Sequence, residues 1–204
     1  MKEKKMNIKE KQIILIGPVC AGKTTLGKLV AEGLNKESVS LDKIAGKYYK
    51  ENGFVFSEYK ELGLTKGKLA AYQYLWSSLA HAAKKVVQDY PNSVIDFGAG
   101  HSHYENAELF ETVKEAIPSD SYVIFLLPSP DLDKSVAIIR EKCLKEREID
   151  WNYDGYDFIE HWIKDKCNHI LADKIIYTEN KTAMESRDEI LALFENTMSK
   201  EERS

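Results

Sequence analysis

Residues 17–24 read GPVCAGKT and follow directly after the apolar run Ile13–Ile16. They match G-x-x-x-x-G-K-[ST], the phosphate-binding loop, which connects a strand to a helix. The next residues fit that helix, because apolar side chains recur at helical spacing over residues 26–34. The motif therefore requires a strand–loop–helix unit of an α/β domain. The alternative interpretation is a glycine-rich strand–helix turn that binds no ligand.

The chemistry of such a loop follows from its backbone. Successive N–H groups point inward and form an anion site at the positive end of the helix. Gly17 and Gly22 allow the positive φ values that the turn needs. We expect Lys23 to reach the β- and γ-phosphates and the Thr24 hydroxyl to coordinate Mg²⁺. The predicted ATP-binding residues are Gly17, Pro18, Val19, Cys20, Ala21, Gly22, Lys23, Thr24 and Thr25.

Five apolar runs alternate with helical patterns, which predicts a parallel sheet covered by helices. The runs are residues 12–16, 38–41, 93–97, 122–127 and 174–177. No internal repeat or low-complexity linker separates them. We expect a single domain over residues 1–204, a three-layer P-loop fold with a five-stranded parallel sheet and helices on both faces.

Two segments extend this minimal fold. The first covers about residues 43–90 and ends in a long amphipathic helix, closed by Pro91; we expect it to bind the acceptor. The second, about residues 141–156, is highly charged, and we expect it to act as a mobile lid over the site. Before it, Ser129-Pro130-Asp131 predicts a helix start capped by Ser129.

Composition excludes several classes of protein. The net charge of −4 does not favour nucleic acid as a partner. No apolar run approaches the roughly 20 residues that a membrane span needs. The first eleven residues, MKEKKMNIKEK, lack the apolar core of an export signal. Three cysteines without C-x-x-C spacing indicate free thiols, so we expect a cytoplasmic protein of unknown oligomeric state.

Two acidic residues end apolar runs, where the functional groups of parallel sheets collect. Asp96 follows Val94-Ile95, and we expect it to hold Mg²⁺ together with Thr24; the alternative is a structural carboxylate that binds the next loop. Asp42 ends the second run and is placed to accept the proton of an attacking hydroxyl. Its other possible role is to cap a helix that starts at Lys43.

The segment after Asp96 is rich in glycine. Gly98, Ala99 and Gly100 would let backbone approach the acceptor closely, and His101 follows as a candidate acceptor contact. His101 and His103 form an H-x-H pair, but no third ligand at metal-site spacing accompanies it. Both histidines are alternatively structural.

Arg140 and Arg147 lie seven residues apart and would project in nearly the same direction from a helix. One could stack on the base of ATP and the other bind the charge that develops on the γ-phosphate. The alternative is two solvated arginines. The loop at residues 178–182 is a plausible adenine pocket, and it does not contain the N-K-x-D guanine motif.

Together these residues resemble the shikimate kinase branch of P-loop kinases, within the nucleoside-monophosphate-kinase-like fold. Four features carry the resemblance: the loop at residues 17–24, Asp42 as the acceptor-binding acid, residues 96–100 in place of the family's glycine triplet, and the spacing of Arg140 and Arg147. The resemblance implies a strand order of 2-3-1-4-5, ATP and Mg²⁺, and phosphorylation of a small-molecule hydroxyl.

The sequence departs from the family pattern at the acceptor. Ser40 stands where the family has a second acid, and Arg147 precedes Glu148-Ile149-Asp150 where the family has a proline–leucine signature. No arginine occurs before Arg140, although the family binds the acceptor carboxylate with one. Lysine does not replace that bidentate fork. Shikimate and nucleoside monophosphates are therefore disfavoured acceptors.

A neutral or cationic hydroxyl compound is easier to accommodate in the segment that follows the second run. Tyrosines and acids are available there to contact it, and two lysines could alternatively bind an anion. The residues are Tyr48, Tyr49, Glu58, Glu61, Lys47 and Lys60.

We expect an ATP-dependent kinase that phosphorylates a hydroxyl of a small metabolite or antibiotic-like acceptor, with Lys23, Asp42, Arg140 and Arg147 as catalytic residues. The alternative is a nucleotide-dependent switch or regulatory ATPase without a small-molecule acceptor. A polynucleotide 5′-hydroxyl kinase is disfavoured by the net charge.

Overall fold

A computed structural model of the chain describes residues 11–201. All but one of the eleven N-terminal residues considered for an export signal lie outside this range. Five strands form one parallel sheet in the order β2-β3-β1-β4-β7. They are β1 (Ile13–Ile16), β2 (Glu37–Ser40), β3 (Ser93–Asp96), β4 (Tyr122–Leu127) and β7 (Lys174–Tyr177). Because β5 (Asn152–Tyr153) and β6 (Tyr156–Asp157) form a separate hairpin, β7 is the fifth strand of this sheet, and the predicted order 2-3-1-4-5 is confirmed.

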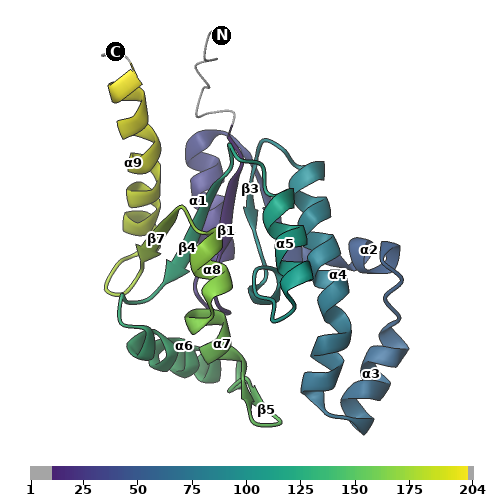
Figure 1. Cartoon of the computed structure of the whole chain (residues 1–204). Helices are drawn as coiled ribbons and strands as arrows, with labels where there is room; N and C mark the ends of the chain where they lie inside the picture. The colour runs from purple at the N-terminus through teal and green to yellow at the C-terminus, as the bar shows by residue number, and fades with distance from the viewer. Residues whose placement is uncertain (1–10, 202–204) are drawn as a thin grey trace.

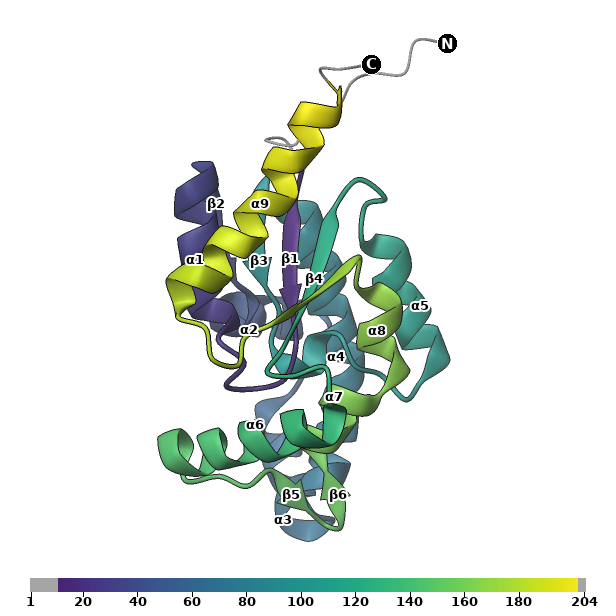
Figure 2. The same ribbon diagram turned by 90° about the vertical axis from the view of Figure 1, so that its left-hand side faces the viewer.

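Helices cover both faces of the sheet, as predicted (Figures 1 and 2). On one face α1 (Lys23–Leu34) packs against α9 (Ala183–Glu201). On the other face lie α4 (Lys68–Asp89), α5 (Ala107–Ala116) and α8 (Lys166–Leu171). Because both faces are covered, the central strands are continuous apolar runs rather than alternating ones, and every residue of β1 is buried.

The boundary of the second strand differs from the prediction by one residue. Leu41 is the first residue of α2 (Leu41–Glu51), not the last residue of a strand. Its side chain is fully buried in the hydrophobic core. Burying a leucine side chain contributes roughly 1.5–3 kcal/mol in either conformation, so the apolar pattern alone did not distinguish them.

The segment at residues 43–90 forms three helices. The long amphipathic helix is confirmed as α4, and α2 and α3 (Phe56–Thr65) pack against it. No residue of α3 is fully buried, and this helix was not among the predicted elements. These helices extend beyond the carboxyl ends of the strands (Figure 1).

The segment at residues 141–156 begins as a helix. The helix α6 (Leu132–Arg147) continues through its charged part because Cys143 is fully buried and fixes this turn. Its cap is Asp131, whose carboxylate accepts from the Lys134 N–H at 3.0 Å; Ser129, the predicted cap, instead accepts from the Asp131 N–H at 3.2 Å. A hairpin of β5 (Asn152–Tyr153) and β6 (Tyr156–Asp157) follows, and α7 (Phe158–Lys164) follows the hairpin.

Across residues 11–201, none of the helices combines the length and the apolar character that crossing a lipid bilayer would require.

Candidate functional site

The loop at residues 17–24 adopts the backbone that its glycines predict. Gly17 has φ of 142° and Gly22 has φ of 88°, values that side chains rarely allow. At Gly17 a Cβ atom would also lie 2.7 Å from the Leu126 carbonyl oxygen on the neighbouring strand. Glycine is therefore required at position 17 both by the positive φ and by the lack of space for a side chain. At Gly22 only the positive φ requires it, because a Cβ there would meet nothing within 4 Å.

Lys23 lies inside this loop and closes it. Its ammonium donates to the Gly17 carbonyl at 2.8 Å and to the Pro18 carbonyl at 2.6 Å. Burial lowers the pKa of Lys23 to about 8, and the nearby carboxylates of Asp42 and Asp96 partly oppose this. A buried cation bonded only to neutral carbonyls favours an anionic ligand, so the loop fits a polyphosphate.

A cavity of about 280 Å³ opens over the loop. Loop residues form one side of it, Asp42 and Ala99 another, and the end of α6 covers it with Lys142 and Arg147. Lys142 also donates to the Cys20 carbonyl at 3.0 Å, which joins the helix to the loop. Lys142 was not among the predicted site residues. Its signal was its position five residues before Arg147, on a helix already expected to cover the nucleotide.

The two predicted acids both lie near Lys23. Asp96 is buried at the end of β3, in register with Leu15 and Ser40 on the flanking strands. Asp42 lies in the first turn of α2, with a side chain that is 69% exposed. The cap position of this helix is Ser40, so Asp42 does not cap a helix that starts at Lys43.

The glycine-rich segment lies directly against Asp42. A Cβ atom at Gly98 would lie 1.8 Å from the Asp42 carboxylate and 2.7 Å from His101 Nδ1. His101 Nδ1 is 3.6 Å from Asp42, and its Nε2 lies 2.9 Å from the Tyr49 hydroxyl. Burial lowers the pKa of His101 to about 4, so its ring is neutral near pH 7. Gly98, His101 and Asp42 therefore form one tight group.

His103 is not part of this group. Its ring lies 3.9 Å from Asp165 and 6.0 Å from the ring of His161, beside α7 rather than at the cavity. The H-x-H pair thus does not converge. Among residues 11–201, no cluster of three or more histidine, cysteine or acidic side chains is arranged to hold a metal ion. Thr24 and Asp96 together offer the hydroxyl and carboxylate oxygens that Mg²⁺ prefers beside phosphates.

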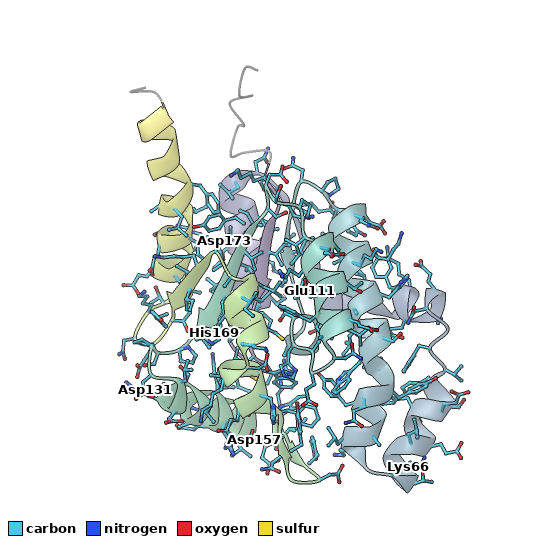
Figure 3. The ribbon with its side chains drawn as sticks, viewed as in Figure 1. Lys66, Glu111, Asp131, Asp157, His169 and Asp173 are labelled. Atoms are coloured by element: carbon cyan, nitrogen blue, oxygen red, sulfur yellow. The ribbon has the colours of Figure 1, made fainter. Side chains whose placement is uncertain are left out.

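The two arginines occupy different places along α6. Arg147 lines the cavity over the loop. Arg140 forms an ion pair with Asp157, the residue that caps α7. Figure 3 shows Asp157 beside α6 at the end of the hairpin. Seven residues turn a helix back to nearly the same direction but advance it by about 10 Å, so one site need not receive both side chains. The nucleotide role of Arg140 remains a prediction.

Two other predicted contacts lie apart from the cavity. Tyr48 is fully buried, and its hydroxyl donates to Asp89 at 2.8 Å, so it does not face an acceptor. The loop at residues 178–182 is held by the Thr178 and Glu179 N–H groups, which donate to Leu127 and Pro128. Its residues are not part of the lining of the cavity over the phosphate loop. Its role as an adenine pocket remains a prediction.

The parallel sheet order, the glycine-bounded loop and the helical cover define the chain as a P-loop α/β protein. Comparison with solved structures narrows this class to the shikimate kinase fold. The shikimate kinase of Acinetobacter baumannii, solved in complex with shikimate, aligns with a TM-score of 0.58 and 19% identity over 92% of this chain and 94% of that one. The enzyme of Aquifex aeolicus aligns with a TM-score of 0.54 and 22% identity over 92% and 98%.

Sequence comparison points in the same direction. The pentafunctional AROM polypeptide of Saccharomyces cerevisiae is 23% identical over 159 residues, which are 78% of this chain. The chain spans 9% of the length of that polypeptide. A shikimate kinase of Marinomonas is 51% identical over 37 residues, 18% of this chain and 20% of that one. No protein-family model matches the chain. The predicted resemblance to shikimate kinases is confirmed.

Proposed function

We propose that this protein is an ATP-dependent kinase that transfers the γ-phosphoryl group to a hydroxyl of a small molecule. One observation carries the proposal: a single cavity is lined both by the phosphate loop with Lys23 and by the exposed carboxylate of Asp42. Phosphoryl transfer needs a positively charged phosphate site and a group that orients the acceptor. Both line the same cavity.

The loop N–H groups and Lys23 would hold the phosphates, and Arg147 and Lys142 would approach them from α6. Thr24 and Asp96 fit Mg²⁺, which would neutralise charge on the phosphates when bound. Asp42 would accept the acceptor proton as its oxygen forms a bond to the γ-phosphorus and the bond to ADP breaks. The neutral ring of His101, 3.6 Å from Asp42, would limit the space in which that carboxylate moves without bonding to it.

Shikimate is the acceptor that the comparison proteins suggest, and it is the first compound to test. Against it, the helices after β2 contain lysines but no arginine for a bidentate contact with a carboxylate. The three cysteines are free thiols, and free thiols favour the cytoplasm as the compartment of this protein.

Purified protein incubated with ATP, Mg²⁺ and a panel of alcohols tests the proposal. The panel contains shikimate, sugars, aminoglycosides and nucleosides. We expect one acceptor to gain the mass of a phosphoryl group and to stimulate ATP consumption, and we expect Lys23→Ala to abolish both. Nucleotide-dependent binding of a partner protein without any phosphorylated acceptor would instead identify a regulatory switch.

A further inference from the structure

A second cavity, of about 500 Å³, lies between the helices α3 and α4 on one side and the hairpin with α7 on the other. Figure 1 shows these elements at the same end of the molecule as α6. The volume is within the range of small-molecule sites. The wall is predominantly aromatic, and its rings belong to Tyr59, Tyr72, Trp151, Tyr153, Phe158 and Trp162.

This aromatic cavity adjoins the candidate active site. Ala99 lines the cavity over the phosphate loop and packs in one cluster with Phe158 and Trp162, which line the aromatic cavity. Further along the same segment, a Cβ atom at Gly100 would lie 2.7 Å from the Tyr72 hydroxyl. The segment at residues 98–100 therefore borders both cavities, with Asp42 beside Gly98 and Tyr72 beside Gly100.

The charges around the aromatic cavity decide between classes of ligand. Rings alone would suit a quaternary ammonium ion. However, Lys60 and Lys68 line the cavity, and none of the described residues of its lining is acidic. The Lys68 ammonium already lies 3.7 Å from the centre of the Tyr153 ring. The chain's own cation occupies that ring face, so a cationic acceptor, which the sequence had left open, is disfavoured.

One further group favours a ligand with oxygen atoms. The indole N–H of Trp151 is buried and has no hydrogen-bond partner in the described part of the chain. A buried donor without a partner is costly, and because the Trp151 ring lines the cavity, a small shift of the indole would let an oxygen of a ligand satisfy it. The lysines at the same cavity attract an anionic or electron-rich edge.

We propose that the aromatic cavity binds the ring system of the acceptor, and that this acceptor is an alcohol built on a flat aromatic ring with an anionic or oxygen-bearing edge. The acceptor role rests on the proposed kinase function. The ring would stack among the aromatic side chains, its outer edge would meet Lys60 and Lys68, and its hydroxyl would pass residues 98–100 to reach Asp42.

A synthetic probe, 6-(hydroxymethyl)-2-naphthoate, carries these features and tests the cavity without nucleotide. Its binding is followed by calorimetry and by quenching of the fluorescence of Trp151 and Trp162. Shikimate is the control, because it has a carboxylate and hydroxyls but no aromatic ring, and choline tests the cationic class. We expect the naphthoate to bind at least tenfold more tightly than shikimate, and choline not to bind.

Two variants locate the bound probe. A Cβ atom at Gly63 would be in ordinary contact, 3.6 Å from the Ala71 side chain, so Gly63→Leu should fill the cavity without a backbone clash. We expect it to weaken probe binding at least tenfold and to leave binding of a fluorescent ATP analogue unchanged. Lys60→Gln should weaken the probe about threefold. Lys66→Gln, at the tip of α3 outside the cavity lining, is its matched control (Figure 3) and should have no effect.

The outcomes separate this inference from the proposed function. Equal binding of naphthoate and shikimate, or probe binding that Gly63→Leu does not weaken, would show that the aromatic cavity does not bind an aromatic ring. This would hold even if the protein phosphorylates another alcohol with ATP. Probe binding that both cavity variants weaken supports the assignment. If the protein then binds ATP but phosphorylates neither the probe nor any alcohol of the panel, the cavity does not bind a kinase acceptor and the proposed kinase function fails with it. The cavity would then be a binding site of another kind.

Discussion

The Nδ1 atom of His101 lies 3.6 Å from Oδ1 of Asp42, too far for a hydrogen bond, while Nε2 of the same ring lies 2.9 Å from the Tyr49 hydroxyl. Burial lowers the pKa of His101 to about 4. The contact at neutral pH is therefore between a carboxylate and a neutral ring, not an ion pair. The Asp42 carboxylate therefore receives no hydrogen bond from this ring, which its proposed role as proton acceptor requires.

Replacing Asp42 with asparagine should lower kcat by about 10²–10⁴-fold, the usual contribution of a general base. Because the side chain is 69% exposed, the melting temperature should change little. ATP binding, measured with a fluorescent analogue, should persist. The neighbouring exposed residue gives the control, since Lys43→Gln should retain full activity. An Asp42→Asn enzyme with unchanged kcat would remove this carboxylate from the mechanism.

Adding one methyl group at Gly98 should impair the site. In Gly98→Ala the Cβ atom would lie 1.8 Å from the Asp42 carboxylate and 2.7 Å from His101, so both side chains must shift. We expect at least a tenfold loss of kcat/KM. Gly46→Ala is the matched control, because a Cβ atom there meets nothing within 4 Å. That change should stabilise α2 by about 0.5–1 kcal/mol without altering kinetics. Equal activity of the two variants would contradict the close approach at Gly98.

Nucleotide binding should take up a proton in mildly alkaline solution. Burial lowers the pKa of Lys23 to about 8, so above that pH the free protein carries a neutral amine in the loop. A bound polyphosphate stabilises the ammonium and raises this pKa again. Calorimetry of MgATP in two buffers of different ionisation enthalpy should report proton uptake at pH 8.5 and almost none at pH 6.5. Indistinguishable heats at pH 8.5 would show that Lys23 does not meet the phosphates.

The two arginines of α6 should behave differently. Arg147 lines the cavity and is exposed, so Arg147→Gln should lower kcat at least tenfold with little effect on the melting temperature. Arg140 is half-buried and paired with Asp157, so Arg140→Gln should mainly reduce stability, by about 1–2 kcal/mol. Thermal unfolding and steady-state kinetics on both variants measure the contrast. If Arg140→Gln abolished nucleotide affinity while remaining fully stable, the predicted contact of Arg140 with the nucleotide would be correct instead.

Stability should fall in mild acid because of His101. Its pKa is about 4 in the folded protein and about 6.5 in an unfolded chain, so the unfolded state binds more protons between these values. The free energy of unfolding should decrease as the pH falls from 6.5 to 4, by up to about 3 kcal/mol from this group. Urea unfolding at several pH values measures the slope, and His101→Gln should reduce it. A slope that the substitution leaves unchanged would assign the effect to other groups.

The elements that could be predicted from the sequence are those that depend on the pattern of neighbouring residues. The strands, the phosphate loop and α4 are each defined by the spacing of consecutive residues. Asp96 and Asp42 were identified because they end apolar runs, and the parallel sheet brings such ends to one edge. These positions follow from chain connectivity and need no knowledge of tertiary packing.

The rest depends on contacts between distant segments. The aromatic cavity combines side chains from Tyr59 to Trp162, which come from α3, α4, the hairpin and α7, so no local sequence pattern could predict it. Arg140 pairs with Asp157, a residue of another element, whereas Arg147 lines the cavity, and this difference depends on a contact that the sequence does not show. The helix α3 buries none of its residues, so its existence is set by its packing partners rather than by its own apolar pattern.

The bonds from Lys23 to the Gly17 and Pro18 carbonyls have one more consequence. They hold the loop in its curved shape before any nucleotide arrives, with the ammonium standing where it can turn toward a phosphate. The conformational entropy of ordering this turn is thus lost when the chain folds and not when the ligand binds. If a triphosphate binds here as proposed, it has only to exchange these two short contacts for stronger ones in a loop that is already ordered.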